Sequence, residues 1–205
     1  MSSLSFSTGL ARFVGAFPCV GFSGSRRGGS APVAACQSFL AACPPATSVA
    51  VGVGCARGVD STVRAAVPAA QVFRVQQPAS RAAFAQRSTR LVQWVAARQG
   101  LLVVFPLGSA PGRLQPGQQF AGFGSGSWGA AALAIGLGAA VLVVVPAGAR
   151  RQGAAQAFPA PPAVARHFVP VGPAPGGCGQ QWLAQPAQQQ CPPAATGQQL
   201  ALIAA

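Results

Sequence analysis

The stretch Gly54-Cys55-Ala56-Arg57-Gly58-Val59-Asp60 decides how the rest of the chain can be interpreted. It follows an apolar run at 49–53 and precedes a segment of helical composition at 61–67, so it lies where a strand turns into a helix. It also contains Asp60, the only acidic residue of the chain. A single carboxylate at such a turn points to a specific role there, either for a ligand or for the turn itself.

Asp60 has two explanations that both stay open at this point. A carboxylate in the first turn of a helix interacts favourably with the helix dipole, and Asp60 lies four residues before Arg64. Alternatively, Asp60 accepts a hydrogen bond from a ligand hydroxyl or holds Arg57 in place.

Around this turn, short apolar runs alternate with segments of helical composition. The runs expected to be strands are 19–23, 48–53, 71–75, 101–105 and 141–145. The expected helices are 31–42, 61–67, 80–99 and 128–137. Continuous Val/Leu runs separated by helices predict a parallel sheet covered on both faces. Right-handed crossovers then give a doubly wound, Rossmann-like α/β domain over residues 18–146, with the expected strand order 3-2-1-4-5.

The two ends of the chain differ in composition from this domain. Residues 1–17 are interpreted as a loose leader, without the basic region of a signal peptide. Residues 147–205 are rich in Pro, Gln, Ala and Gly and are predicted to be a low-complexity extension. One extra strand is expected there at 167–171, and short helices at 180–190 and 198–205.

The uncharged span Gly129–Gly148 is long enough to suggest a membrane helix. Gly136 and Gly138 interrupt it, and the residues beyond them change from Ala/Leu to Val. A helix, a glycine stop and a buried strand explain this change better than one spanning helix. We therefore expect no membrane partner and a cytoplasmic location.

The chain of 205 residues carries a net charge of +13, and every basic residue is an arginine. Such a field attracts polyanions, and arginine offers bidentate contacts to phosphate and stacking on bases. Arginine also keeps the protein soluble, so both explanations remain. The cysteines form no Cys-x-x-Cys pair, and His167 alone cannot complete a zinc site, so we expect no metal and reduced, buried thiols.

Two glycine-rich loops are candidates for phosphate binding. Gly24–Gly29 follows the first predicted strand, and Gly124-Ser125-Gly126-Ser127 precedes the helix at 128–137. Glycine lets the backbone approach a phosphate closely, and a helix N-terminus offers free N–H groups. In the predicted strand order the two loops face each other across a crevice, with Arg57 nearby.

The long helix at 80–99 adds arginines to this picture. Arg87 and Arg90 are three residues apart, share a side of the helix and could grip one phosphate. Trp94 is interpreted as core and His167 as structural. Trp128 stands beside the second glycine loop and is equally consistent with the core and with a pocket wall.

Several of these motifs resemble the SLOG superfamily, the Rossmann-like domains of DNA-processing protein A (DprA/Smf), the LOG phosphoribohydrolases and YspA/YpsA-like proteins. Residues 20–26, VGFSGSR, resemble the opening "(V/I)x(V/I)xGSR", and residues 54–60 are similar to "GxARGxD". Arg87-Ser88-Thr89-Arg90 lies where many members carry Arg-Asn-Arg, and residues 124–127 resemble the glycine loop before the fifth strand. The resemblance covers about residues 18–146.

The resemblance implies a site for a nucleotide, a nucleotide-derived ligand or, in the DprA branch, single-stranded DNA. Together with the residue pattern it predicts a set of ligand- and phosphate-binding residues. These are Gly24, Ser25, Arg26, Arg57, Gly58, Asp60, Arg87, Arg90, Gly124, Ser125, Gly126 and Ser127.

The chain departs from the LOG enzymes in their "PGGxGTxxE" loop. Ala130 stands at the position of the glutamate, and Gly122-Phe123 replace the Pro-Gly. Cleavage of a glycosidic bond needs a carboxylate, which only Asp60 could supply. We therefore expect a non-catalytic binding protein for a nucleotide or nucleotide derivative, without a cofactor. DprA-like binding of single-stranded DNA, a LOG-like phosphoribohydrolase and a purely structural protein are the alternatives, and homo-oligomerisation stays open.

Overall fold

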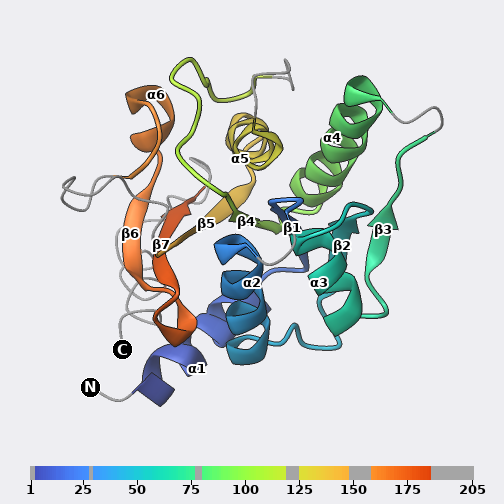
Figure 1. Ribbon diagram of the computed structural model, residues 1–205. Coiled ribbons are helices and arrows are strands. Elements are labelled where there is room, and N and C mark those ends of the chain that lie inside the picture. Colours follow the sequence, from blue (N-terminus) through green and yellow to red (C-terminus); the bar gives the residue numbers. More distant parts are fainter. Residues whose placement is uncertain (1–2, 28–29, 77–79, 119–124, 148–157, 186–205) are drawn as a thin grey trace.

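The computed structural model describes residues 3–27, 30–76, 80–118, 125–147 and 158–185. In these ranges the chain forms a 7-stranded sheet flanked by helices (Figure 1). The strands are β1 (Cys19–Gly24), β2 (Ala50–Gly54), β3 (Gln71–Phe73), β4 (Leu101–Phe105), β5 (Ala140–Pro146), β6 (Val169–Pro173) and β7 (Gly179–Ala184). The helices are α1 (Ser3–Gly15), α2 (Ala31–Ala42), α3 (Val59–Ala66), α4 (Arg81–Ala97), α5 (Gly126–Gly136), α6 (Pro162–Ala165) and the short 3₁₀ helix η1 (Pro175–Gly177).

The sheet has the order β3-β2-β1-β4-β5-β7-β6, which contains the predicted 3-2-1-4-5 arrangement. The first five strands are parallel, and β7 and β6 add two antiparallel strands beyond β5. The predicted doubly wound, Rossmann-like α/β architecture is confirmed. The turn at 54–60 and the loop after β1 consequently lie at the same, carboxyl edge of the sheet.

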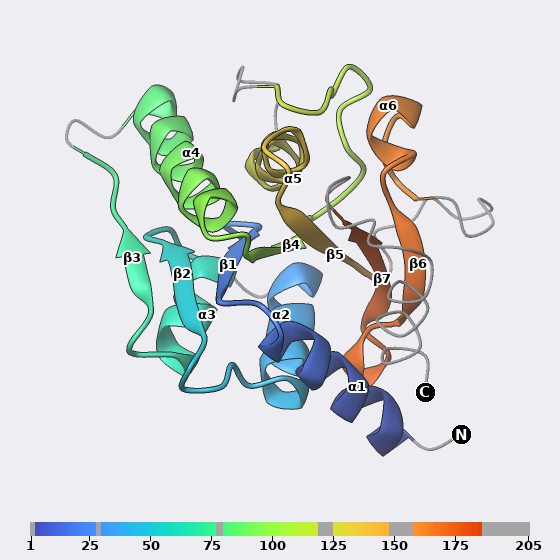
Figure 2. The same cartoon turned by 180° about the vertical axis from the view of Figure 1, so that it is seen from behind.

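The central strands are buried on both faces of the sheet, as the continuous Val/Leu runs predict, and β4 and β5 are buried at every position. Leu101, Val103 and Phe105 of β4 belong to one apolar cluster, whereas Leu102 and Val104 belong to the other. Helices α1, α2 and α3 contribute to the first cluster, and α4, α5 and α6 to the second. Figure 2 shows the same two helical layers from behind.

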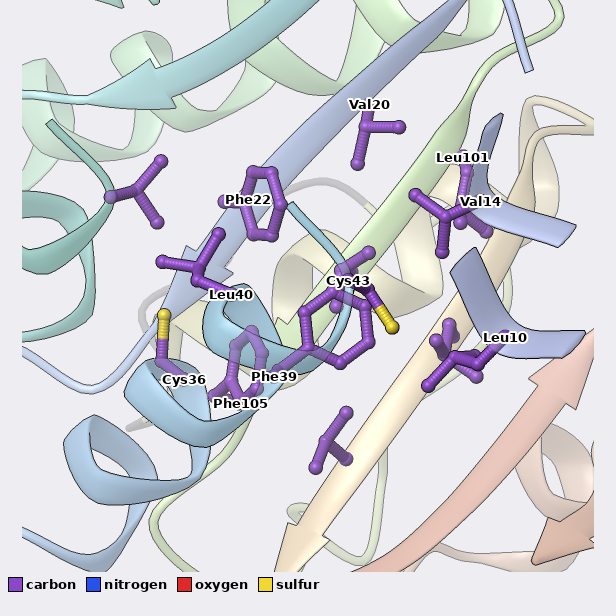
Figure 3. Packing of buried hydrophobic residues seen from close by; sticks show 14 of the residues in the cluster. Leu10, Val14, Val20, Phe22, Cys36, Phe39, Leu40, Cys43, Leu101 and Phe105 are labelled. Atoms are coloured by element: carbon purple, nitrogen blue, oxygen red, sulfur yellow. The ribbon is translucent and has the colours of Figure 1, made fainter. Parts of the chain in front are cut away.

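In the first cluster, Phe39 of α2 packs against two phenylalanines of the sheet, Phe22 of β1 and Phe105 of β4 (Figure 3). The ring of Phe39 meets Phe22 at 6.3 Å and Phe105 at 5.8 Å between centroids, both edge to face. Aromatic rings favour this arrangement, and each buries a large apolar area. α2 is thereby fixed against the neighbouring strands β1 and β4.

The N-terminal segment is not the loose leader that its composition suggests. Ser3–Gly15 forms α1, and Leu10, Phe13 and Val14 are buried in the first cluster. The spacing of these three residues places them on one face of a helix. The serines and glycines around them hide this short apolar stripe in the sequence.

The C-terminal extension also contains more structure than predicted. The extra strand expected at 167–171 is present as β6, shifted to Val169–Pro173, but a second strand, β7, precedes the end of the described chain. Residues 180–184 are therefore strand where the sequence suggested helix. β7 pairs with β5 from Val141↔Ala184 to Pro146↔Gly179, so a pairing distant in sequence overrides the glutamine-rich composition. Residues 186–190 and the helix expected at 198–205 lie outside the described residues.

The span 129–148 is divided as predicted into a helix, a glycine turn and a strand. α5 ends at Gly136, Gly138 adopts a positive φ of 74°, and β5 begins at Ala140. Among the helices of the described chain, none is both long and apolar enough to cross a membrane.

Two thiols of α2 and its C-terminal cap are sealed inside the first cluster. Cys36 and Cys43 are fully buried and unpaired (Figure 3). Burial raises the pKa of each thiol from the ordinary 9.0 to about 12, and the negative charge of Asp60 adds to the rise at Cys36. The folded state therefore keeps both thiols protonated in moderately alkaline solution.

The protein should lose stability between pH 9.0 and about 12 because of these two thiols. The unfolded chain releases their protons above the ordinary value while the folded chain retains them, so the free energy of unfolding falls by about 1.4 kcal/mol per pH unit per thiol. The chain contains neither lysine nor tyrosine, which leaves cysteine as the side chain that titrates in this window. Urea unfolding followed by circular dichroism under reducing conditions measures the slope. A Cys36→Ala/Cys43→Ala variant should show a flatter profile, and an unchanged slope would contradict the assignment.

Candidate functional site

The carboxyl edge of the sheet brings together the loop after β1 and the turn after β2. The backbone N–H of Ser25 donates to the carbonyl of Phe105 at 3.2 Å, and the carbonyl of Ser25 accepts from the N–H of Val59 at 3.0 Å. Ser25 thus links the end of β4 to the start of α3. This part of the predicted meeting of loops is present in the structure.

Glycines allow the two segments to approach. Gly58 has a φ of 69°, which favours glycine, and a Cβ there would collide with the carbonyl oxygen of Ser25 and lie 2.8 Å from the carbonyl carbon of Arg26. A Cβ on Gly24 would lie 2.8 Å from the Cβ of Val59. The glycines of both motifs are therefore needed for contact between the motifs.

Asp60 lies inside this turn rather than facing solvent. Its Oδ2 forms an ion pair with Arg87 Nη1 at 2.6 Å, and only 7% and 9% of the two side chains are exposed. The same oxygen accepts the backbone N–H of Ala56 at 3.1 Å. The partner of Asp60 is Arg87 of α4, whereas Arg57 is exposed. Asp60 thus ties the β2 turn to α4.

Arg64 completes the turn from the other side. Its guanidinium donates to the carbonyl of Gly54 at 2.7 Å and to that of Ala56 at 3.0 Å. Arg64, four residues after Asp60, therefore stabilises the backbone of the turn, because its guanidinium N–H groups donate to these two carbonyls.

Gly54 provides the space in which the ion pair lies. A Cβ at this position would collide with Arg87 Nη1 and Asp60 Oδ2 and lie 2.6 Å from Arg87 Cζ. Gly54, the first residue of the motif, must therefore lack a side chain, because Asp60 at the end of the motif and Arg87, 27 positions after Asp60, occupy that space.

The two arginines predicted to grip one phosphate have separate partners within the protein. Arg87 is buried and paired with Asp60, and Arg90 Nη2 donates to the carbonyl of Arg74 at 2.6 Å. Each guanidinium is therefore anchored to the protein through one of its Nη atoms, and their joint grip on a phosphate stays a prediction. Arg26 and Arg57, by contrast, are exposed on adjacent loops.

The second glycine loop is described from Ser125 onward, and Gly124 lies outside the described residues. Ser125 caps α5 by accepting the N–H of Trp128 at 3.5 Å, and its Oγ is 3.1 Å from that of Ser127. Ser127 is buried and Gly126 is exposed. These hydrogen bonds stay within the first turn of α5 and do not reach the β1 or β2 segments. The first turn of α5 is therefore a candidate phosphate site separate from the contact between Ser25 and Val59.

The tryptophans next to the predicted site belong to the core. Trp128 is fully buried, its Nε1 donates to the carbonyl of Gly108 at 2.7 Å, and its ring meets Phe158 at 5.5 Å. Trp94 is partly buried against Phe73, at 5.8 Å between ring centroids. Of the two alternatives for Trp128, the structure supports the core.

His167 and Ala130 stand at positions considered for metal binding and for catalysis. His167 is exposed, and partial desolvation and the nearby Arg166 lower its pKa. Ala130, at the position of the LOG glutamate, is fully buried. Within the described ranges there is no cluster of His, Cys, Asp or Glu that could hold a metal ion.

The spacing of Phe84, Leu91, Val92 and Val95 in the sequence predicts only that Phe84 lies on the buried face of the long helix. The structure places its ring beside two arginines, with Arg26 Cζ at 5.2 Å and Arg87 Cζ at 5.9 Å from its centroid. Contacts therefore run from Gly58 to Arg26, Phe84, Arg87 and back to the turn through Asp60. No signal in the sequence connects these residues, because α4 meets the β1 loop only in the folded chain.

The fold and the edge together define an α/β protein with a Rossmann-like sheet and an arginine- and glycine-rich turn at its carboxyl edge. Comparison of the chain with protein-family models, with curated proteins and with solved structures found no match.

Replacing Arg87 by Met should lower the free energy of unfolding by about 3–5 kcal/mol, because it leaves the Asp60 carboxylate buried without its counter-charge. Arg81→Met, at an exposed position of the same helix, should change it by less than about 0.5 kcal/mol. Urea titrations of both variants measure the two values. Adding Asp60→Asn to Arg87→Met should recover part of the loss, and equal effects of the two arginine substitutions would contradict the role of the pair.

Proposed function

We propose that the protein binds a nucleotide or a nucleotide derivative at the carboxyl edge of its sheet, without catalysing a reaction on it. The observation that carries the proposal is the contact of Ser25 with Val59 and Gly58, which fixes the loop bearing Arg26 beside the turn bearing Arg57. Both arginines are exposed, and each can offer two parallel N–H groups to phosphate oxygens.

The charge balance at this edge supports an anionic ligand. Asp60, the only acidic residue of the chain, is buried and neutralised by Arg87, so no carboxylate side chain competes for the exposed arginines. The N-terminus of α3 lies directly behind the Arg57 turn and adds the positive end of a helix dipole. Backbone, dipole and guanidinium groups therefore favour the same kind of ligand.

The same arrangement supports binding rather than glycosidic cleavage. A carboxylate that activates water or stabilises a cationic sugar must reach the ligand, whereas Asp60 Oδ2 is occupied by Arg87 and by the N–H of Ala56. Asp60 serves in this proposal as the residue that holds the turn in place.

Arg57→Ala should weaken the binding of adenosine monophosphate about 10- to 100-fold, as expected for loss of a charge-assisted hydrogen bond to phosphate. Arg98→Ala is the matched control, because Arg98 is also exposed but lies directly before β4, at the opposite edge of the sheet. Isothermal titration calorimetry at low salt measures both affinities. Equal affinities of the two variants would show that Arg57 is not part of a phosphate site.

Binding of single-stranded nucleic acid is a second candidate, favoured by where the exposed arginines lie. Six exposed arginines of the described chain follow the carboxyl ends of successive strands or begin the helix after β3, whereas Arg12, Arg98 and Arg166 lie elsewhere. The six are Arg26, Arg27, Arg57, Arg74, Arg81 and Arg113. Several arginines along one edge can contact several phosphates of an extended single strand at once, whereas a small ligand in one pocket would contact only a few of them.

A salt titration with a fluorescent oligothymidine distinguishes the two candidates. Contacts to several phosphates should make the logarithm of affinity fall with the logarithm of salt concentration by about 0.7 per phosphate, so a strand bound along the edge gives a slope steeper than about −2. Arg74→Ala/Arg81→Ala should make this slope shallower, whereas Arg98→Ala/Arg166→Ala should leave it unchanged. A slope near zero, or identical effects of both double variants, would exclude the edge as a nucleic-acid surface.

A further inference from the structure

Phe84 is placed where an aromatic ring has a use beyond packing. It lies in the first turn of α4, which begins at the carboxyl edge after β3, and its N–H donates to the carbonyl of Ser80 at 3.0 Å. The side chain is only partly buried, unlike Leu91, Val92 and Val95 further along the helix. Part of the ring is thus accessible at the same edge as Arg26 and Arg57.

The two guanidinium groups beside the ring are held very differently. Arg87, at 5.9 Å from the ring centroid, is buried and fixed by its ion pair with Asp60. Arg26, at 5.2 Å, is exposed, and its backbone is packed against Gly58. Arg26 can therefore leave the ring by side-chain rotation, whereas Arg87 cannot move without breaking the ion pair.

An exposed cation–π contact is weak, and a planar heterocycle stacks on the same kind of surface more strongly than a hydrated guanidinium does. Exchange of the guanidinium for a flat ring is therefore favourable when the guanidinium gains a phosphate contact at the same time. A ligand that joins a phosphate to an aromatic base by a sugar supplies both groups within one molecule.

We propose that Phe84 is the surface that recognises the planar base of the ligand, covered by Arg26 in the free protein and uncovered when Arg26 turns to the phosphate. This inference rests on the proposed nucleotide site and adds the part of the ligand that the arginines alone cannot distinguish. Arg87 and Asp60 act as positioning residues, since their ion pair fixes Arg87 beside the ring and ties the turn to α4.

The test compares adenosine monophosphate with ribose 5-phosphate, which lacks the base, by calorimetry. Phe84→Leu should weaken binding of the nucleotide about tenfold and leave the sugar phosphate unchanged, whereas Phe84→Tyr, which keeps the ring, should bind both as the parent protein does. Phe17→Leu is the matched control, because Phe17 is also partly buried but precedes β1 at the opposite edge. Thermal melts of all variants establish that each is folded.

Arg26→Ala provides a second readout that does not alter the ring. Adenosine, which has no phosphate, should bind this variant several-fold more tightly than it binds the parent protein, because the ring no longer has to be uncovered. Equal losses for nucleotide and sugar phosphate in Phe84→Leu, or no loss for either, would overturn the role of Phe84 while leaving the phosphate site intact. Failure of the parent protein to bind either ligand would overturn the phosphate site itself and this inference with it.

Discussion

The ion pair between Asp60 and Arg87 is the interaction on which the carboxyl edge of this protein depends. It joins the first turn of α3 to α4 across the end of β2. The pair occupies the space beside Gly54, where any side chain at position 54 would collide with it. Burying two charges costs free energy unless other polar groups replace the hydrogen bonds that the charges made with water. Here the N–H of Ala56 also donates to Asp60, so the carboxylate gains a backbone partner in addition to the guanidinium.

The ion pair and the hydrogen bonds beside it account for several residues of the turn at 54–60. Asp60 accepts the N–H of Ala56, and Arg64 donates to the carbonyls of Gly54 and Ala56, so side chains satisfy three backbone groups of the turn. Gly58 can then adopt its positive φ and press against Ser25, because the turn on either side of it is fixed. The contact between the β1 and β2 segments is in this sense a consequence of the buried charges.

The sequence predicts the parallel part of the sheet well, because each Val/Leu run and each helix is a local pattern. The bounds of α2 and β4 and the division of the span 129–148 follow from such patterns, whereas the expected order of β1 to β5 rests on the right-handed crossover rule. β7 could not be predicted in this way, since Gln180 and Gln181 become strand only by pairing with β5. The partner of Asp60 escaped prediction for the same reason: Arg64 is near in sequence, but the fold brings Arg87 to the carboxylate.

The direction of the strands accounts for the accumulation of positive charge at one edge. In a parallel sheet each strand ends where the next helix begins, so α2, α3, α4 and α5 all start at the carboxyl edge and present the positive ends of their dipoles there. The exposed arginines of the loops after β1, β2 and β3 add to the same potential, and the one carboxylate that could oppose them is buried and paired. Because neither contribution depends on a particular ligand, attraction for anions is a property of the edge itself. Phe84 is an uncharged group beside the arginines at this edge, and in the proposed site its ring is the group that would distinguish one anionic ligand from another.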